Sequence, residues 1–206
     1  MNLIGLCNLY WWSINDNPDN PLLISKEMIV QFLNDAVKEL SQVVDYKKYA
    51  EIIPEDSTGI IPLPTDVIKI EKARWSDKDL SPISDIHTAL LYKPDRKVSQ
   101  YYHLNLATVQ VFPAPKEDDT GPLKIWYKAY LPALINDNDA PVDIPEEYHK
   151  DLALVFVRAQ HAFKMGRYSE YQFLANLWED IKKELGGEYT SRVVTVIDEN
   201  QGRFNW

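Results

Sequence analysis

Apolar residues recur every three or four positions between Ser25 and Val44, and polar residues fill most of the positions between them. This spacing places the apolar side chains on one face of a helix. Ser25 is a good N-cap, and Glu27 favours the positive end of the helix dipole. The pattern therefore predicts an amphipathic helix over about 25–45, after a loop at 15–21 that contains two prolines.

Two more patterns of helical spacing lie after residue 144. The first begins at Pro145, which suits the first turn of a helix, and ends near Gly166. The second ends at Gly186–Gly187, because a glycine pair favours a helix C-terminus. We therefore expect helices at about 145–165 and 169–185. The residues expected to face inward include Phe163, Phe173, Leu174, Leu177 and Trp178.

The pattern changes between about 52 and 130, where prolines separate short apolar runs. Leu123–Tyr130 alternates between two faces, as a strand does. Turn-forming residues at Ser76–Asp79 and Asn105–Ala107 predict two hairpins, and a short helix is expected at Ser84–Leu91. Because the connections are expected to be short, the sheet is expected to be antiparallel.

The last segment, residues 187–206, has a different character. Val193–Ile197 is strongly β-prone and has no local hairpin partner. Such a strand docks either on the sheet of its own chain or on the edge of a partner, and the sequence leaves both alternatives open. The chain also contains six Trp and 12 Tyr, residue types that are enriched at interfaces. Together, the unpaired strand and this aromatic content indicate an assembly protein. The candidate partner-binding residues are Val193, Val194, Val196, Ile197, Phe204 and Trp206.

Together these elements predict an α+β fold. A helical bundle, made of the long N-terminal helix and the C-terminal helix hairpin, carries an inserted antiparallel β region at about 52–130. We expect one domain over residues 1–186 and an extended C-terminal arm over 187–206. The apolar segment around Trp11 and Trp12 fits a short helix or an arm.

Composition narrows the classes of partner. The 206 residues hold 22 Lys+Arg and 31 Asp+Glu, which gives a formal net charge of −9. This acidic balance disfavours nucleic-acid binding by general charge attraction. The one cysteine, Cys7, cannot form an intrachain disulfide and fits a reducing compartment. The first basic side chain is Lys26 and the apolar runs are short, so neither a signal peptide nor a membrane span is expected.

The sequence contains no strong motif for catalysis or metal binding. The four histidines share no metal-ligand spacing. Asp137–Asp139 resembles the start of a calcium loop, but Val142 occupies the position that needs glycine and Tyr148 the position that needs Glu. We therefore expect no catalytic residue, no cofactor and no metal. The alternative to assembly is a ligand- or carbohydrate-binding module that uses exposed aromatics such as Trp126 and Tyr130.

Four short motifs, in a fixed order, resemble a known family. Ile29–Leu40 is similar to its early helix, and Ile61–Val67 contains a Leu-Pro-x-Asp entry to the sheet. Val109–Pro115 resembles a strand that ends in Pro-x-Pro, and Val142–Leu152 resembles the opening of a helix hairpin. Over about 25–185, the chain resembles the head–tail connector (adaptor) proteins of tailed bacteriophages, particularly those of short-tailed and related phages.

The resemblance implies a structural virion protein rather than an enzyme, with residues 1–186 as the connector domain. Members form a ring, typically of twelve copies, below the portal, which extends the DNA channel and presents a docking surface for a tail or nozzle protein. DNA passes without specific binding, and an acidic wall suits that passage because it repels phosphates. The family often clamps the portal with a C-terminal extension, a role that suits Val193–Ile197. The expected location is the head–tail junction, after assembly in the bacterial host cytoplasm and without a membrane partner.

Overall fold

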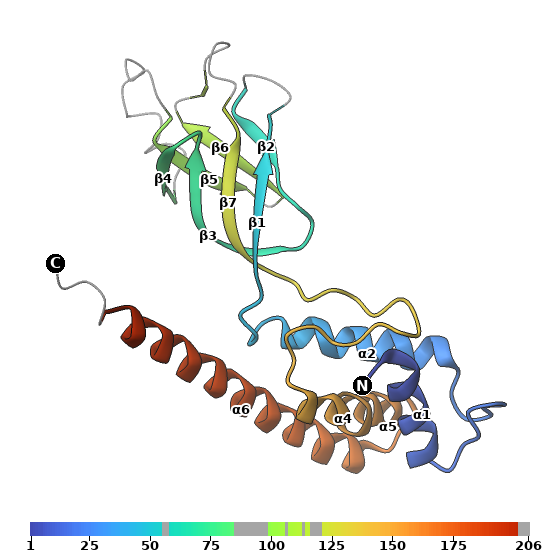
Figure 1. The fold of residues 1–206 in the computed structure, drawn as a ribbon. Helices are drawn as coiled ribbons and strands as arrows, with labels where there is room; N and C mark the ends of the chain where they lie inside the picture. The colour runs from blue at the N-terminus through green and yellow to red at the C-terminus, as the bar shows by residue number, and fades with distance from the viewer. Residues whose placement is uncertain (55–57, 85–98, 106, 113, 116–120, 202–206) are drawn as a thin grey trace. The chain divides into compact units, whose positions relative to one another are not determined.

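The chain forms two compact units in a computed structural model that describes residues 1–54, 58–84, 99–105, 107–112, 114–115 and 121–201 (Figure 1). In the last helix, side chains are described as far as Gly187. The helical unit contains Met1–Tyr46 and Leu131–Trp206, and the sheet unit contains Lys47–Tyr130.

The helices and helical turns of the helical unit are α1 (Leu3–Ser13), α2 (Lys26–Leu40), η1 (Glu146–Tyr148), α4 (His149–Asp151), η2 (Leu152–Val157), α5 (Arg158–Lys164) and α6 (Tyr168–Gln201). Ser25 caps α2 as the sequence predicts, because its side chain accepts a hydrogen bond from the backbone N–H of Met28. The buried face of α2 carries the predicted apolar residues, including Phe32, Leu33 and Val37.

The centre of the helical unit is the π-helical segment η2, which continues α4 and leads into α5 (Figure 1). Five of its residues are buried: Leu152, Ala153, Val155, Phe156 and Val157. Helices α1, α2 and α6 all contact this segment. The core of the unit therefore forms around one apolar run, and the long amphipathic helices cover it.

Two hydrogen-bonded positions on and just after α2 hold the chain segment that returns from the sheet unit. The buried Ser41 hydroxyl accepts from the Leu131 backbone N–H at 3.0 Å and donates to the Val37 carbonyl at 2.9 Å. The Asn34 side chain pairs with the backbone of Leu134 in both directions, at 2.7 and 3.1 Å. These bonds satisfy buried backbone groups of a segment that has no regular secondary structure.

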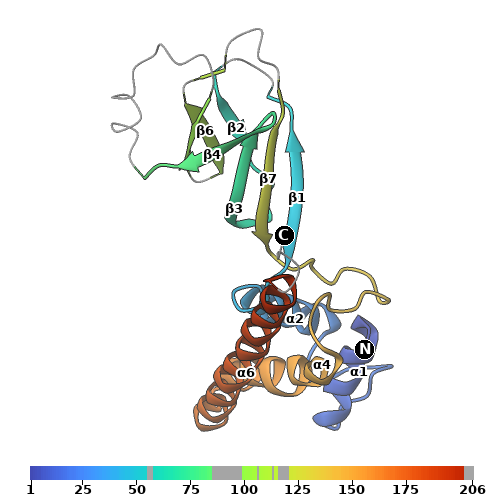
Figure 2. The ribbon, with the colours of Figure 1, turned by 60° about the vertical axis from the view of Figure 1, so that its left-hand side comes forward.

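The strands of the sheet unit are β1 (Lys47–Ile52), β2 (Ile60–Pro62), β3 (Val67–Trp75), β4 (Lys78–Pro82), β5 (Tyr101–Asn105), β6 (Thr108–Phe112) and β7 (Leu123–Ala129). Their spatial order is β1-β7-β3-β4-β5-β6-β2, and the sheet curls (Figures 1 and 2). Both predicted hairpins are confirmed, as β3–β4 and as β5–β6. Leu123, Ile125, Tyr127 and Ala129 are buried on one face of β7, as the alternation predicts.

The predicted fold class is wrong. The strands form a seven-stranded curled sheet with its own compact unit, so the chain is a mixed α/β protein rather than a helical bundle with an inserted β region. The sheet is also not purely antiparallel, because Ser81 and Pro82 of β4 pair in parallel with β5. A hairpin turn reverses the chain and gives antiparallel neighbours, whereas a parallel pair needs a longer connection, and 18 residues separate Pro82 of β4 from Tyr101 of β5. The edge strand β1 is a further element that the sequence patterns did not predict.

The prediction of an extended C-terminal arm is also wrong. Helix α6 passes through Gly186–Gly187 and ends at Gln201, so Val193–Ile197 is helical rather than a strand. Neither glycine has the positive φ of a helix C-cap. β-branched residues lower helix propensity by less than about 1 kcal/mol each, so a helix already nucleated by packing can extend through them. Of the helix expected at Ser84–Leu91, all but Ser84 lies outside the described residues.

Candidate functional site

Exposed aromatic side chains gather where α5 turns into α6. Phe163, Met165 and Tyr168, which we call the aromatic corner, are each more than half exposed. The Phe163 ring centroid lies 6.0 Å from that of Tyr168 and 5.1 Å from that of Tyr171. Large apolar side chains that stay in water are typical of interaction surfaces when they cluster.

A tight turn fixes the aromatic corner. Gly166 has φ 72°, the left-handed conformation of a helix C-cap, and its N–H donates to the Phe163 carbonyl at 3.0 Å. Glu170 then joins the two helices, accepting from Arg158 at 2.8 Å and from Arg167 at 2.9 Å. The corner is therefore presented on a braced turn rather than on a loose loop.

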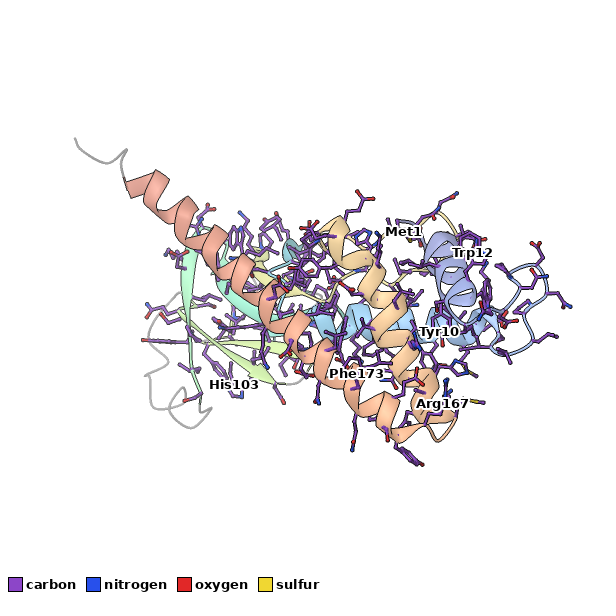
Figure 3. All side chains as sticks on the ribbon, turned by 90° about the horizontal axis from the view of Figure 1, so that it is seen from below. Met1, Tyr10, Trp12, His103, Arg167 and Phe173 are labelled. Atoms are coloured by element: carbon purple, nitrogen blue, oxygen red, sulfur yellow. The ribbon has the colours of Figure 1, made fainter. Side chains whose placement is uncertain are left out.

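The outer side of α6 extends this exposed apolar surface. Phe173 is 69% exposed and Leu177 is 39% exposed, whereas their neighbours Leu174 and Trp178 are buried. Figure 3 labels Phe173 on this helix and Arg167 directly before its first residue. The prediction that Phe163, Phe173 and Leu177 face inward is therefore wrong. Consecutive residues lie about 100° apart around a helix of 3.6 residues per turn, and the core covers the side of α6 that carries Leu174 and Trp178, which leaves Phe173 and Leu177 exposed.

A second exposed apolar set lies on α1 and on the loop that follows it. Trp12, Leu22 and Leu23 are exposed, and Figure 3 labels Trp12. The Asp16 carboxylate shapes the loop, because it accepts from the backbone N–H groups of Leu22 at 3.1 Å and Leu23 at 2.9 Å. These bonds lower the pKa of Asp16. The Trp11 indole N–H donates to the Ile24 carbonyl at 3.0 Å, so Trp11 anchors the loop while Trp12 stays exposed.

The structure places the predicted partner-binding residues in two groups. Val193, Val194, Val196 and Ile197 lie in the distal part of α6. Phe204 and Trp206 lie outside the described residues. Their role in binding stays a prediction.

Trp126 and Tyr130, the aromatics of the alternative ligand-binding hypothesis, lie on or directly after β7. The Trp126 ring centroid lies 5.1 Å from that of Tyr49 on β1, and the Lys72 ammonium lies 5.7 Å from the Trp126 ring. Neighbouring side chains of the same sheet thus cover part of this indole. It is only partly exposed.

The buried titratable groups serve packing. Burial raises the pKa of the Cys7 thiol to about 11, so it stays protonated at neutral pH. Burial lowers the pKa of both His149 and His161. His149 donates from Nε2 to the Ile144 carbonyl at 2.9 Å, and the Tyr10 hydroxyl lies 2.6 Å from Nδ1 of His161. Both imidazoles are therefore neutral hydrogen-bonding groups inside the helical unit.

Within the described ranges, no three His, Cys, Asp or Glu side chains are grouped so that they could hold a metal ion. The loop that resembles the start of a calcium site is held by its own carboxylate instead. Asp139 accepts from the backbone N–H groups of Ile135 and Asn136, both at 2.8 Å, and these bonds lower its pKa. No described helix is long and apolar enough to cross a membrane.

A shallow groove of about 390 Å³ lies between α6 and the end of α2, and four charged side chains line it together with Gln42 and Val43. Glu39 accepts from the Trp178 indole at 2.9 Å, and Lys182 lies 3.3 Å from Glu39 and 2.6 Å from Glu179. The charges in the groove pair with one another, so it joins the two helices rather than forming a ligand pocket.

The sequence patterns did not predict the aromatic corner or the exposed outer side of α6. A signal for them was available in the apolar residues at 173, 174, 177 and 178, which together span more of the helix surface than one buried face needs. Such a wide apolar arc indicates that the core covers only one side of it and leaves the other side exposed.

A comparison with protein families finds one match. The family model described as SU10 adaptor protein matches residues 1–196. The match includes both compact units and most of α6. No curated protein matches the chain.

Proposed function

The chain belongs to the SU10 adaptor protein family, and from this premise we propose that it forms the ring that joins the phage head to the tail. Family membership implies a structural, non-enzymatic adaptor that contacts other structural proteins of the bacteriophage particle. The finer proposal is a ring of twelve copies below the portal, which extends the DNA channel and receives a tail or nozzle protein.

The observation that carries the proposal is the family match over residues 1–196. The exposed apolar side chains of the helical unit support it. The aromatic corner together with the outer side of α6 forms one group, and the set around Trp12, on α1 and the loop after it, forms a second group on the same unit. A ring subunit needs at least two different contact surfaces, because the head-to-tail contacts that close a ring are heterologous.

The distal part of α6 and the segment after it are the proposed portal contact. Val193, Val194, Val196, Ile197, Phe204 and Trp206 remain its candidate residues. In this proposal, residues 1–186 form the ring and residues 187–206 reach the portal. The net charge of −9 suits a wall along which DNA slides without specific binding, because carboxylates repel phosphates.

The test is to size the purified chain alone and with purified portal, by light scattering and negative-stain microscopy. We expect the chain to be monomeric or weakly associating alone and to form a ring on the portal. A chain that ignores the portal, or a tight closed dimer, would contradict the proposal. A chain truncated after Gly186 is the matched variant, because it should keep the helical core but lose attachment. If truncation unfolds the core, the clamp role of 187–206 is wrong.

A further inference from the structure

The outward face of β1, β7 and β3 is rich in basic side chains. These three strands lie side by side (Figures 1 and 2). Residues paired directly across antiparallel strands share a face of the sheet. The pairs Lys47–Lys128, Tyr49–Trp126 and Glu51–Lys124 join β1 to β7, and Lys69, Lys72 and Arg74 pair with the same β7 residues from the other side. We call the basic and aromatic residues of this set the basic face: Lys47, Tyr49, Lys69, Lys72, Arg74, Lys124, Trp126 and Lys128, with the carboxylate of Glu51 on the same side of the sheet.

The basic face has six cationic side chains around two aromatic rings, with fewer carboxylates on the same strands. Lys47 lies 3.2 Å from Glu71, and Asp79 on β4 lies 3.3 Å from Lys72 and 2.7 Å from Arg74. The side chains of Lys47 and Lys72 remain 53% and 51% exposed. The face is therefore ordered by ion pairs yet keeps a surplus of positive charge open to solvent.

The net charge of the chain is not shared evenly between its two units. The sheet unit contains 12 Lys/Arg and 12 Asp/Glu, which gives zero. The helical unit contains the remaining 10 Lys/Arg and 19 Asp/Glu, which gives −9. The basic face thus belongs to a unit with no net charge. The helical unit carries the whole net negative charge of the chain, so its surface is opposite in sign to the basic face.

One segment of the helical unit matches the basic face in chemistry. From 136 to 149 the chain has five carboxylates and no Lys or Arg. Asp137, Asp143, Glu146 and Glu147 are exposed, and so are the apolar side chains of Ile135 and Val142. We call residues 135–147 the acidic edge. Its carboxylates would meet the lysines of the basic face, and its apolar side chains would meet Tyr49 and Trp126.

We infer that the basic face of one copy docks on the acidic edge of a neighbouring copy, an inference that rests on the ring proposed above. The contact is heterologous, since it joins two different surfaces, and such contacts close into rings when the rotation between copies permits. Electrostatic complementarity would set the register between copies and disfavour pairing of like units.

Nucleic acid is the competing occupant, and the geometry of the face argues against it. Single-stranded binding uses aromatic rings as open stacking platforms. Here the Trp126 ring packs against Tyr49 and under Lys72. Carboxylates also lie among the lysines and would repel phosphates. A surface of mixed sign with a small positive surplus suits an acidic protein surface better than a polyphosphate.

The test is a charge swap in the full-length chain, assembled on purified portal. Lys47→Glu/Lys72→Glu reverses two exposed cations of the basic face, and Glu146→Lys/Glu147→Lys reverses two exposed carboxylates of the acidic edge. Each double variant should raise the chain concentration for half-maximal ring assembly about tenfold or more, because like charges would then face each other. The chain that carries all four changes should assemble like the wild type.

The control for Lys47→Glu/Lys72→Glu is Lys78→Glu/Lys183→Glu, which makes the same change in net charge at exposed lysines outside the basic face. This control variant should assemble normally. Thermal unfolding of every variant checks that it is folded. If the wild type forms a ring and Lys47→Glu/Lys72→Glu does so at the same concentration, this docking is wrong while the ring stands. If the wild type forms no ring on the portal, the proposed function fails and this inference with it.

A titration with fluorescent duplex and single-stranded DNA tests whether the basic face binds nucleic acid instead of a neighbouring copy. Salt-sensitive DNA binding that is lost in Lys47→Glu/Lys72→Glu, together with no rescue of assembly by the fourfold swap, would overturn the inference in favour of nucleic acid. Rescue by the swap, with DNA binding absent or unchanged, would support the contact between copies.

Discussion

The glycine pair in α6 gives a sharp prediction about how this helix is held together. Gly186 and Gly187 lie in the helix interior with no positive φ, so neither position requires glycine. A Cβ built on Gly186 would meet Val43 at 3.7 Å, an ordinary van der Waals contact, and a Cβ on Gly187 would meet nothing within 4 Å. Alanine should therefore fit at both positions without strain.

The magnitude follows from helix propensity. Each glycine is less favourable than alanine by about 0.8–1.0 kcal/mol in a helix interior, so Gly186→Ala/Gly187→Ala should stabilise the distal helix by about 2 kcal/mol. Since about 1.4 kcal/mol is a factor of ten, helix opening beyond the pair should become about 30-fold rarer. Amide hydrogen exchange in 188–201 that requires the helix to open through the pair should slow by that factor, exchange by fraying from Gln201 should not change, and helical circular dichroism should not fall.

Gly166→Ala is the matched control, because it makes the same chemical change with the opposite expected sign. Gly166 has φ 72°, where an added Cβ is strained whatever the space, so alanine there should lower the melting temperature. Unchanged exchange in 188–201 for the double alanine variant would refute the reasoning that α6 propagates through the glycine pair. Equal effects of the alanine changes at 166 and at 186–187 would refute the assignment of their conformations.

Three further predictions concern the helical unit. Burial lowers the folded-state pKa of His149 and His161, so the unfolded state binds protons first as the pH falls below about 6.5. The stability that the two neutral, buried imidazoles contribute is therefore present above that pH and is lost below it. His161→Gln should reduce the fall in melting temperature between pH 7.5 and 5.5, and an unchanged fall would contradict this assignment. Ser41→Ala leaves the buried N–H of Leu131 without its acceptor, so urea unfolding should show a loss of about 1–3 kcal/mol, and no loss would contradict the bond. Trp178→Ala should cost about 3–5 kcal/mol, because the buried indole packs 5.0 Å from the Phe156 ring, while Trp178→Phe should cost less; equal costs would contradict a role for ring packing.

The sequence by itself determined the elements that local interactions decide. The N-cap at Ser25 and the apolar face of α2 depend on residues within one or two helical turns, so their spacing is enough to predict them. The alternation in β7 and the two hairpins are equally local, because a tight turn brings adjacent strands together. The family resemblance also came from the order of such local motifs.

Only the tertiary structure decided the features that depend on distant segments. The parallel pairing of β4 with β5 and the addition of β1 to β7 join residues far apart in the chain, and no local pattern specifies them. Propensity favoured a helix end at Gly186–Gly187 and a strand at Val193–Ile197, yet cooperative extension from the packed part of α6 outweighs both. The exposure of Phe163 and Phe173 likewise follows from which side of each helix the core of the unit covers. Periodicity marks apolar positions, but packing decides which of them remain available to a partner.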